Sequence, residues 1–225
     1  MTEVHIPAGR ALLSGNLTIQ ENSEALLLFA HGSGSSRHSP RNQFVARTLN
    51  RTGLGTLLFD LLTPEEEALD IYTRAHRFNI GLLAERLAYA TKWAGQQKET
   101  RDQRIGYFGS STGGAAALVA AAEFTQEVRA VVSRGGRPDL AGDALPKVKA
   151  PTLLILGGND ETVVELNEMA RDRMHCEVKL EIIPGATHLF EEPGALEQVA
   201  KLAGDWFVNH IGAGSAGRPR NTYEG

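Results

Sequence analysis

Cysteine is nearly absent from this chain of 225 residues. Because Cys176 is its single cysteine, no intrachain disulfide can form, and a reducing cytoplasm is compatible with the sequence. Cys176 lies between a helical pattern and a strand pattern, without the glycine-flanked turn of a catalytic nucleophile. We therefore expect a packing residue at this position rather than a catalytic thiol.

The chain also lacks long runs of basic residues and long runs of apolar residues. The formal net charge is −4, and no lysine- or arginine-rich run indicates a nucleic-acid surface. No apolar run approaches the length of a membrane span, and residues 1–6 have neither the basic nor the apolar segment of a secretion signal. No closely spaced cluster of histidine, cysteine and carboxylate residues indicates a metal site. We expect a soluble cytoplasmic protein with no metal or cofactor, and with neither nucleic acid nor membrane as a partner.

What the chain does have is a regular alternation of strand and helix patterns. The expected strands are residues 4–6, 12–19, 25–30, 55–60, 104–108, 130–133, 152–156 and 178–183, and the expected helices are about 41–51, 80–97, 112–124, 163–174 and 194–210. This alternation is typical of a mostly parallel α/β sheet, with the first two strands as an antiparallel edge. The length and the 42% hydrophobic content fit one domain, assigned to residues 1–211, and the glycine-rich residues 212–225 are expected to form a disordered tail.

The most informative segment is the string Gly-Ser-Ser-Thr-Gly at residues 109–113. An apolar strand pattern precedes it and an alanine-rich helical pattern follows it. This G-x-S-x-G arrangement is typical of a nucleophile elbow, in which a strand turns sharply into a helix and presents the central serine. Glycines at both ends allow the strand and the helix to pass closely. The segment predicts Ser111 as a nucleophile.

A serine nucleophile needs a base and a group that orients the base. Asp160 and His188 each follow closely after a predicted strand. Because the carboxyl ends of parallel strands meet at one edge of a sheet, Ser111, Asp160 and His188 should lie on the same edge. Asp139 follows another strand and is an alternative acid, but the two glycines just before Asn159 favour Asp160.

The order of these motifs resembles the alpha/beta-hydrolase superfamily, and most of all its small dienelactone hydrolase-like branch. The resemblance runs from about Leu12 to about His210 and rests on G-S-S-T-G, L-I-L-G-G-N-D and P-G-A-T-H. It implies a doubly wound, mostly parallel eight-stranded sheet without a large lid domain, a Ser-His-Asp triad, and hydrolysis of an ester or related acyl bond. Dienelactone hydrolases proper use a cysteine where this chain has Ser111, so their particular substrate is not carried over.

Serine attack on a carbonyl also requires donors for the oxyanion that forms, and two backbone N–H groups usually supply them. One is expected from Thr112, directly after the predicted nucleophile at a helix N-terminus. The segment His-Gly-Ser-Gly at residues 31–34 resembles the H-G-x-G oxyanion loop of the superfamily. Ser33 is therefore the second expected donor, with Gly34 as the alternative, and His31 is expected to order the loop through its own hydrogen bonds.

Arginines gather in the loops that follow two of the predicted strands. Guanidinium groups bind carboxylate and phosphate well, which makes an anionic substrate one hypothesis. The alternative is that the glutamates at residues 65–67, expected on the same edge, pair with these arginines. The four arginines are Arg37, Arg41, Arg134 and Arg137.

A fold and a triad do not fix the chemistry, so three functions stay open. The first is hydrolysis of a small soluble ester, because only the short segment 138–150 stands where many relatives insert a lid domain. The second is lactone hydrolysis of the dienelactone type, acyl transfer or carbon–carbon cleavage on the same triad. The third is a non-catalytic interaction module.

Overall fold

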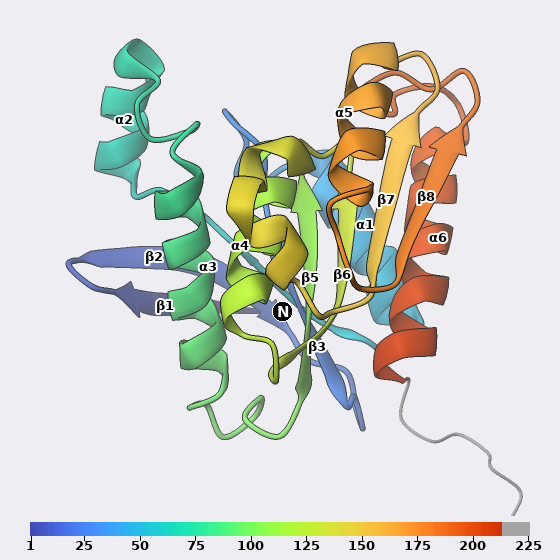
Figure 1. Cartoon of the computed structure of the whole chain (residues 1–225). Helices are drawn as coiled ribbons and strands as arrows, with labels where there is room; N and C mark the ends of the chain where they lie inside the picture. The colour runs from blue at the N-terminus through green and yellow to red at the C-terminus, as the bar shows by residue number, and fades with distance from the viewer. Residues whose placement is uncertain (213–225) are drawn as a thin grey trace, which may run out of the picture.

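Eight strands form one sheet at the centre of the protein in the computed structural model, which describes residues 1–212 (Figure 1). The predicted tail, apart from Gly212, lies outside the described residues. Across the sheet the order is β1-β2-β4-β3-β5-β6-β7-β8. The strands are β1 (Thr2–Ala8), β2 (Ala11–Thr18), β3 (Ala25–Ala30), β4 (Gly55–Phe59), β5 (Arg104–Ser110), β6 (Val128–Arg134), β7 (Thr152–Gly157) and β8 (Val178–Ile183).

The direction of the strands confirms the predicted α/β fold. From β4 through β3, β5, β6 and β7 to β8 each neighbouring pair is parallel, whereas β1 pairs with β2, and β2 with β4, in antiparallel fashion. The helical elements are α1 (Pro40–Arg51), α2 (Pro64–Thr73), α3 (Ile80–Ala94), α4 (Thr112–Glu123), the 3-10 segment η1 (Pro138–Lys147), α5 (Glu161–Arg171) and α6 (Ala195–Ile211). The carboxyl ends of the parallel strands therefore share one edge, as a candidate site at that edge requires.

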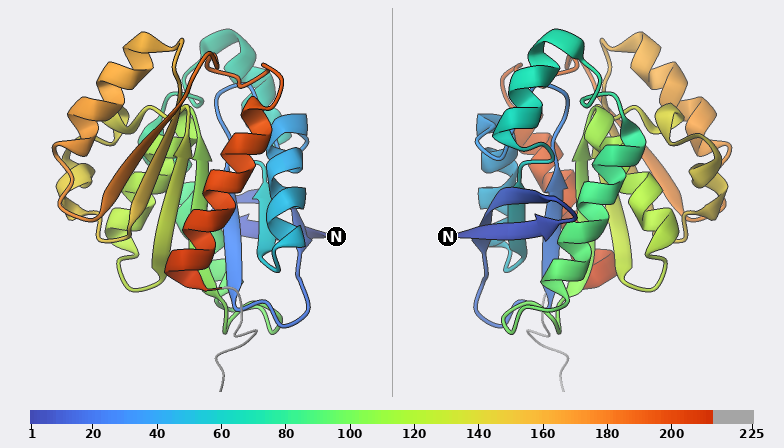
Figure 2. Two further views of the ribbon diagram at one scale, coloured as in Figure 1. Left: turned by 90° about the vertical axis from the view of Figure 1, so that its right-hand side faces the viewer. Right: turned by 90° about the vertical axis from the view of Figure 1, so that its left-hand side faces the viewer.

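Helices cover both faces of the sheet, and each face has its own apolar cluster (Figure 2). On one face Phe108 of β5 and Val132 of β6 pack with residues of α1 and α6. On the other face Tyr107 and Val131 pack with residues of α3 and α4. Strands buried on both faces read as continuous apolar runs in the sequence, which explains why β3 and β7 were predictable.

Two elements were not predicted, α2 and η1. In α2 a capping box joins Thr63 and Glu66, but only Asp70 of the helix is buried. Such a helix lacks the apolar stripe by which helices are recognised. In η1 two short turns meet at Gly142, whose φ is +52°. Within residues 1–212 no helix combines the length and the hydropathy needed to cross a bilayer.

Candidate active site

Ser111 lies at the turn between β5 and α4 in the conformation expected of an elbow. Its φ of 52° and ψ of −122° are strained for a residue with a side chain. A Cβ added to Gly109 would come within 2.5 Å of the Gly113 carbonyl oxygen, and one added to Gly113 within 2.1 Å of the Ala30 carbonyl oxygen. Both glycines are therefore required by close backbone packing, and Ser111 is presented at the N-terminus of α4.

His188 and Asp160 form the second part of the site. The Nδ1 atom of His188, in the loop after β8, lies 2.7 Å from Oδ2 of Asp160, which follows β7. This contact occupies Nδ1 and orients the imidazole ring, and Nε2 remains available for another partner. The alternative acid, Asp139, is instead held by two contacts of 2.8 Å from the guanidinium of Arg137. The geometry thus joins His188 to Asp160 and not to Asp139.

The chain at the end of β6 adjoins both Ser111 and His188. The Ser111 N–H donates to the Arg134 carbonyl oxygen at 3.2 Å, and a Cβ added to Gly135 would lie 3.6 Å from Cε1 of His188. Among the described residues no hydrogen bond joins the Ser111 hydroxyl to the imidazole. Such contacts often tighten only when substrate is bound, so the triad contact from Ser111 to His188 stays a prediction.

The loop at residues 31–34 lies directly against the elbow. A Cβ added to Gly32 would be 3.0 Å from Cβ of Ser111, and the Ser33 hydroxyl is 3.1 Å from the Thr112 hydroxyl. Within the described part of the chain, the backbone N–H groups of Ser33 and Thr112 donate to no protein acceptor. The structure therefore brings Ser33 and Thr112 into contact beside Ser111, and their role as oxyanion donors stays a prediction; Gly34 has a φ of +66° in the following turn.

His31 orders this loop as a neutral imidazole. Its Nδ1 lies 2.9 Å from the Gly32 carbonyl oxygen, and its Nε2 accepts from the Leu61 N–H at 3.0 Å. One ring nitrogen must therefore carry the proton and the other must not. Burial lowers the pKa of His31 below its ordinary value, against the opposing influence of the Gly32 carbonyl and nearby carboxylates. The predicted hydrogen bonding of His31 is present.

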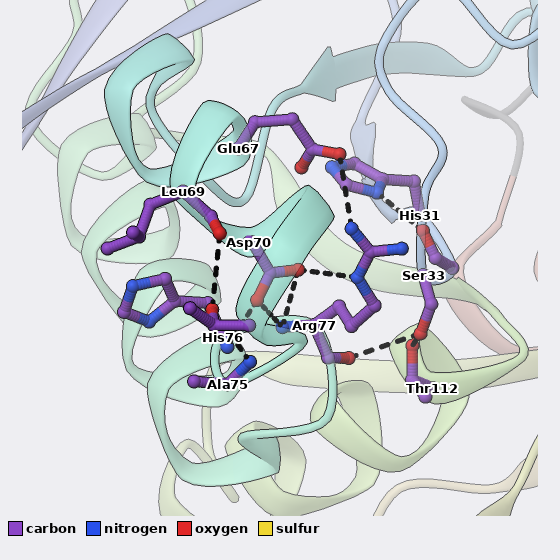
Figure 3. Close-up of polar contacts among 11 residues, drawn as sticks. His31, Ser33, Glu67, Leu69, Asp70, Ala75, His76, Arg77 and Thr112 are labelled. Atoms are coloured by element: carbon purple, nitrogen blue, oxygen red, sulfur yellow. Dashed lines mark hydrogen bonds and ion pairs between the residues drawn. The ribbon is translucent and has the colours of Figure 1, made fainter.

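An ion pair between Asp70 of α2 and Arg77 adjoins the loop at residues 31–34 (Figure 3). Asp70 is fully buried and contacts Nε of Arg77 at 2.5 Å and the His76 N–H at 2.6 Å. The carbonyl oxygen of Arg77 in turn accepts from the Ser33 hydroxyl at 3.2 Å. Sequence reasoning missed Asp70 and Arg77, because neither residue follows a strand or belongs to a recognised motif.

Three of the four arginines singled out in the sequence contact carboxylates of the chain. Arg37 is bound by Asp60 and lies 3.3 Å from Glu3, Arg41 lies 3.0 Å from Glu191, and Arg137 is bound by Asp139. Arg134 has no such partner within residues 1–212. The suggested pairing with the glutamates 65–67 is wrong, since Glu66 binds Arg86 and Glu67 lies 3.9 Å from Arg77.

A cavity of about 580 Å³ opens beside the loop at residues 31–34. Its wall includes Ser33 from the loop, Arg41 from the start of α1, and Thr63 and Glu67 from the region of α2. These four wall residues carry polar or charged side chains.

Several known proteins are similar to this chain over most of its length. Proteins from two strains of Mycobacterium tuberculosis, named provisionally as phosphoribosyl transferases, are 57% identical over 216 residues, covering 96% of this chain and 48% of each relative. The chain thus spans about half the length of the curated relatives it matches. The crystal structure of a dienelactone hydrolase from Anabaena variabilis is also 57% identical, with a TM-score of 0.92, covering 93% of this chain and 97% of that chain.

More distant structures share the fold. A dienelactone hydrolase-like promiscuous phosphotriesterase from metagenomic libraries has a TM-score of 0.77 at 16% identity, covering 94% of this chain and 98% of that chain. The family model of the dienelactone hydrolase family matches residues 46–208, which contain the elbow and the His188–Asp160 pair. The chain therefore belongs to the dienelactone hydrolase family and has the fold of the alpha/beta hydrolases.

Proposed function

We propose that this protein is a serine hydrolase that cleaves a carboxylic ester of a small, soluble substrate through an acyl-enzyme. The observation that carries the proposal is the strained Ser111 at the N-terminus of α4, on the same sheet edge as the bonded His188–Asp160 pair. Membership of a hydrolase family supports the same reaction class. A histidine oriented by a carboxylate is the usual base for a serine nucleophile.

The reaction takes place in two halves. His188 accepts the Ser111 proton at Nε2, the Ser111 oxygen bonds to the acyl carbon, and the protonated imidazole then passes the proton to the leaving alkoxide. The N–H groups of Thr112 and Ser33 hold the oxyanion of each tetrahedral intermediate. Water then attacks the acyl-enzyme with the same base, which releases the acid and restores the Ser111 hydroxyl.

Lactone opening is the second candidate, on the same residues. In a lactone the leaving alkoxide stays attached to the acyl group, so the same steps yield a hydroxy acid. The name of the Anabaena variabilis relative, a dienelactone hydrolase, favours this candidate. We infer no phosphoribosyl transfer for this chain, because the elbow and the His188–Asp160 pair are suited to acyl chemistry.

The proposal is tested with a panel of acyl esters and lactones of different length and charge, with Ser111→Ala as the inactive control. A fluorophosphonate probe should label the unmodified protein covalently at Ser111. Ser110→Ala is the matched control, since its hydroxyl donates to Asn42 at 3.2 Å and faces away from this chemistry. Equal turnover or labelling of the Ser111→Ala protein would contradict the mechanism. An added alcohol acceptor separates hydrolysis from acyl transfer by its products.

A further inference from the structure

The connection from α2 to α3 is held by one buried carboxylate. Asp70, in the last turn of α2, is fully buried, and it accepts the His76 N–H at 2.6 Å, the Arg77 N–H at 3.3 Å and the Arg77 Nε–H at 2.5 Å. Hydrogen bonds to an ionised, buried carboxylate are stronger than those between neutral groups in water. Both the backbone and the side chain of Arg77 are therefore held by a single residue.

Arg77 meets the loop at residues 31–34 through two of its groups (Figure 3). Its carbonyl oxygen accepts from the Ser33 hydroxyl at 3.2 Å. Its guanidinium packs against the next turn, because a Cβ added to Gly34 would lie 3.6 Å from Nη1 of Arg77. The order that Asp70 gives to Arg77 is thus passed to this loop.

The hydroxyl groups in this contact have a single possible direction of donation. The Ser33 Oγ lies 3.2 Å from the Arg77 carbonyl oxygen and 3.1 Å from the Thr112 Oγ1. A carbonyl oxygen can only accept, so the one hydrogen of the Ser33 hydroxyl is directed to Arg77. The Thr112 hydroxyl must then donate to Ser33. The hydrogen bonds run from the start of α4, through the loop at residues 31–34, to the connection between α2 and α3.

These hydrogen bonds join the two residues whose N–H groups are the proposed oxyanion donors. The side chains of Ser33 and Thr112 contact each other, so the separation of their backbone N–H groups is restricted. Thr112 is 3% exposed, and little water competes for its hydroxyl. Donors stabilise an oxyanion best when they are already in place before it forms. The side chains of these two residues therefore bear on the same step as their N–H groups.

We propose that Asp70, Arg77 and the hydroxyls of Ser33 and Thr112 are positioning residues, which fix the loop at residues 31–34 against α4 and so preorganise the oxyanion hole. This inference rests on the proposed hydrolase function for the identity of the oxyanion. The four residues act through the two backbone N–H groups, whose full effect is reached only when the oxyanion forms. Breaking the hydrogen bonds should therefore lower kcat and leave KM nearly unchanged.

The first test removes the hydroxyls and keeps the backbone. Ser33→Ala and Thr112→Val should each reduce kcat for a cleaved ester about 10- to 100-fold, with KM within about twofold, whereas Thr112→Ser retains the hydroxyl and should stay within about threefold of the unmodified kcat. Ser110→Ala is the matched control, since that hydroxyl, one residue before the nucleophile, donates to Asn42 at 3.2 Å. An unchanged kcat in Ser33→Ala and Thr112→Val would overturn the proposal.

The second test separates positioning from a general loss of structure. Asp70→Asn should lower kcat about 10-fold or more. Arg86→Gln is the matched control, because Arg86 is also buried and also attached to α2, through Glu66 at 2.7 Å, while its second contact is the Ala8 carbonyl at 3.0 Å. Both changes should destabilise the fold, and only the first should reduce kcat. Equal losses of kcat would assign Asp70 a purely structural role. If Asp70→Asn does not fold, the hydroxyl variants decide, since they remove no charge.

The third test uses phenylboronic acid, whose boron atom accepts the oxygen of a serine nucleophile. The tetrahedral adduct with Ser111 places an oxygen where the oxyanion forms, so its Kd should rise by about the same factor as kcat falls across Ser33→Ala, Thr112→Val and Asp70→Asn. A folding defect alone would reduce the amount of binding protein and leave the Kd of the folded fraction unchanged. That second result would contradict a positioning role.

The fourth test needs no turnover. The Ser35 N–H donates to the Gly32 carbonyl oxygen at 3.2 Å, so its hydrogen exchange, followed by NMR, reports opening of the loop. Exchange should be about 10-fold faster in Ser33→Ala and Asp70→Asn and unchanged in Arg86→Gln. Ester cleavage with unchanged exchange in Asp70→Asn would remove the positioning role and leave the hydrolase standing. The expected exchange pattern in a protein that cleaves no ester would overturn the hydrolase and with it the oxyanion, while the contact between Asp70 and the loop stands.

Discussion

Arg77, which is half-buried, and Arg134, which is buried, lie on either side of the candidate nucleophile and differ in how their charge is balanced. Arg77 lies 2.5 Å from the buried Asp70 and 3.9 Å from Glu67, on the side of the β3 loop. Arg134, at the end of β6, has no carboxylate partner among the described residues. The strand order β3-β5-β6 puts Ser111, after β5, between the two. A cation balanced within the chain supports the fold, whereas an unbalanced one is available to a ligand.

The ion pair of Asp70 with Arg77 also orders the backbone around it. Burial opposes ionisation of Asp70, but hydrogen bonds from Arg77 and from the backbone N–H groups of His76 and Arg77 outweigh it and hold the pKa of Asp70 below its ordinary value. The charged Asp70 thereby fixes residues 76 and 77, and the Arg77 carbonyl contacts the Ser33 hydroxyl. Arg77 thus contacts the loop at residues 31–34 through its backbone carbonyl.

The largest expected effect comes from removing the group that both arginines flank. Ser111→Ala should reduce kcat for any cleaved ester by about 10⁴-fold or more, because the covalent step is lost. The free energy of unfolding should change little, since alanine keeps the Cβ atom and the backbone conformation of this position and only the hydroxyl is lost. Steady-state kinetics and urea unfolding measure the two quantities, and a loss of stability instead of turnover would contradict the role of Ser111.

Asp70→Asn removes the ion pair that balances the charge of Arg77. This change leaves the Arg77 guanidinium without its buried carboxylate, so the free energy of unfolding should fall by roughly 3 kcal/mol. Glu67→Gln is the matched control, because its contact with Arg77 is longer and Glu67 is 37% exposed, and it should change stability by less than about 1 kcal/mol. Urea unfolding followed by circular dichroism gives both values. Equal effects of the two changes would show that burial of Asp70 does not decide the energetics.

Replacing Arg134, which has no carboxylate partner among the described residues, should change the free energy of unfolding in the opposite direction. Arg134→Met replaces an uncompensated buried cation by an apolar side chain of similar length, so stability without added anion should be unchanged or higher, by up to about 2 kcal/mol. Phosphate should then raise the Tm of the unmodified protein more than that of the variant. Thermal unfolding with and without phosphate tests this. A destabilisation as large as that of Asp70→Asn would remove the contrast between the two arginines.

The smallest expected effect is a dependence of stability on pH from His31. Its pKa in the folded protein lies below the ordinary value of 6.5, so below pH 6.5 the unfolded chain binds more protons than the folded one. The free energy of unfolding should therefore fall as the pH drops from 6.5 toward the folded pKa. His31→Gln keeps a donor and an acceptor but cannot titrate, and its unfolding should vary less over this range. Matching curves for both proteins would assign the pH dependence to another group.

How far the site was predictable depends on whether its signals are local. The elbow was predictable because its signal lies within five consecutive residues. Only glycine fits at positions 109 and 113, where the structure shows close backbone contacts. Asp160 and His188 were predictable because parallel strands end on one edge. In contrast, α2 was missed, since its capping box stands in a segment with only Asp70 buried.

The sequence by itself determined the fold class, the strands and the candidate nucleophile, because hydrophobic period and glycine positions act over short distances along the chain. It also indicated a group of four arginines near the site, but not which of them have carboxylate partners. They are Arg37, Arg41, Arg134 and Arg137. Only the tertiary structure decided which carboxylate meets which guanidinium, and so left Arg134 as the unbalanced charge. The physical reason is that ion pairs form between residues far apart in the chain, such as the contact of Arg41 with Glu191, and local sequence carries no information on such partners.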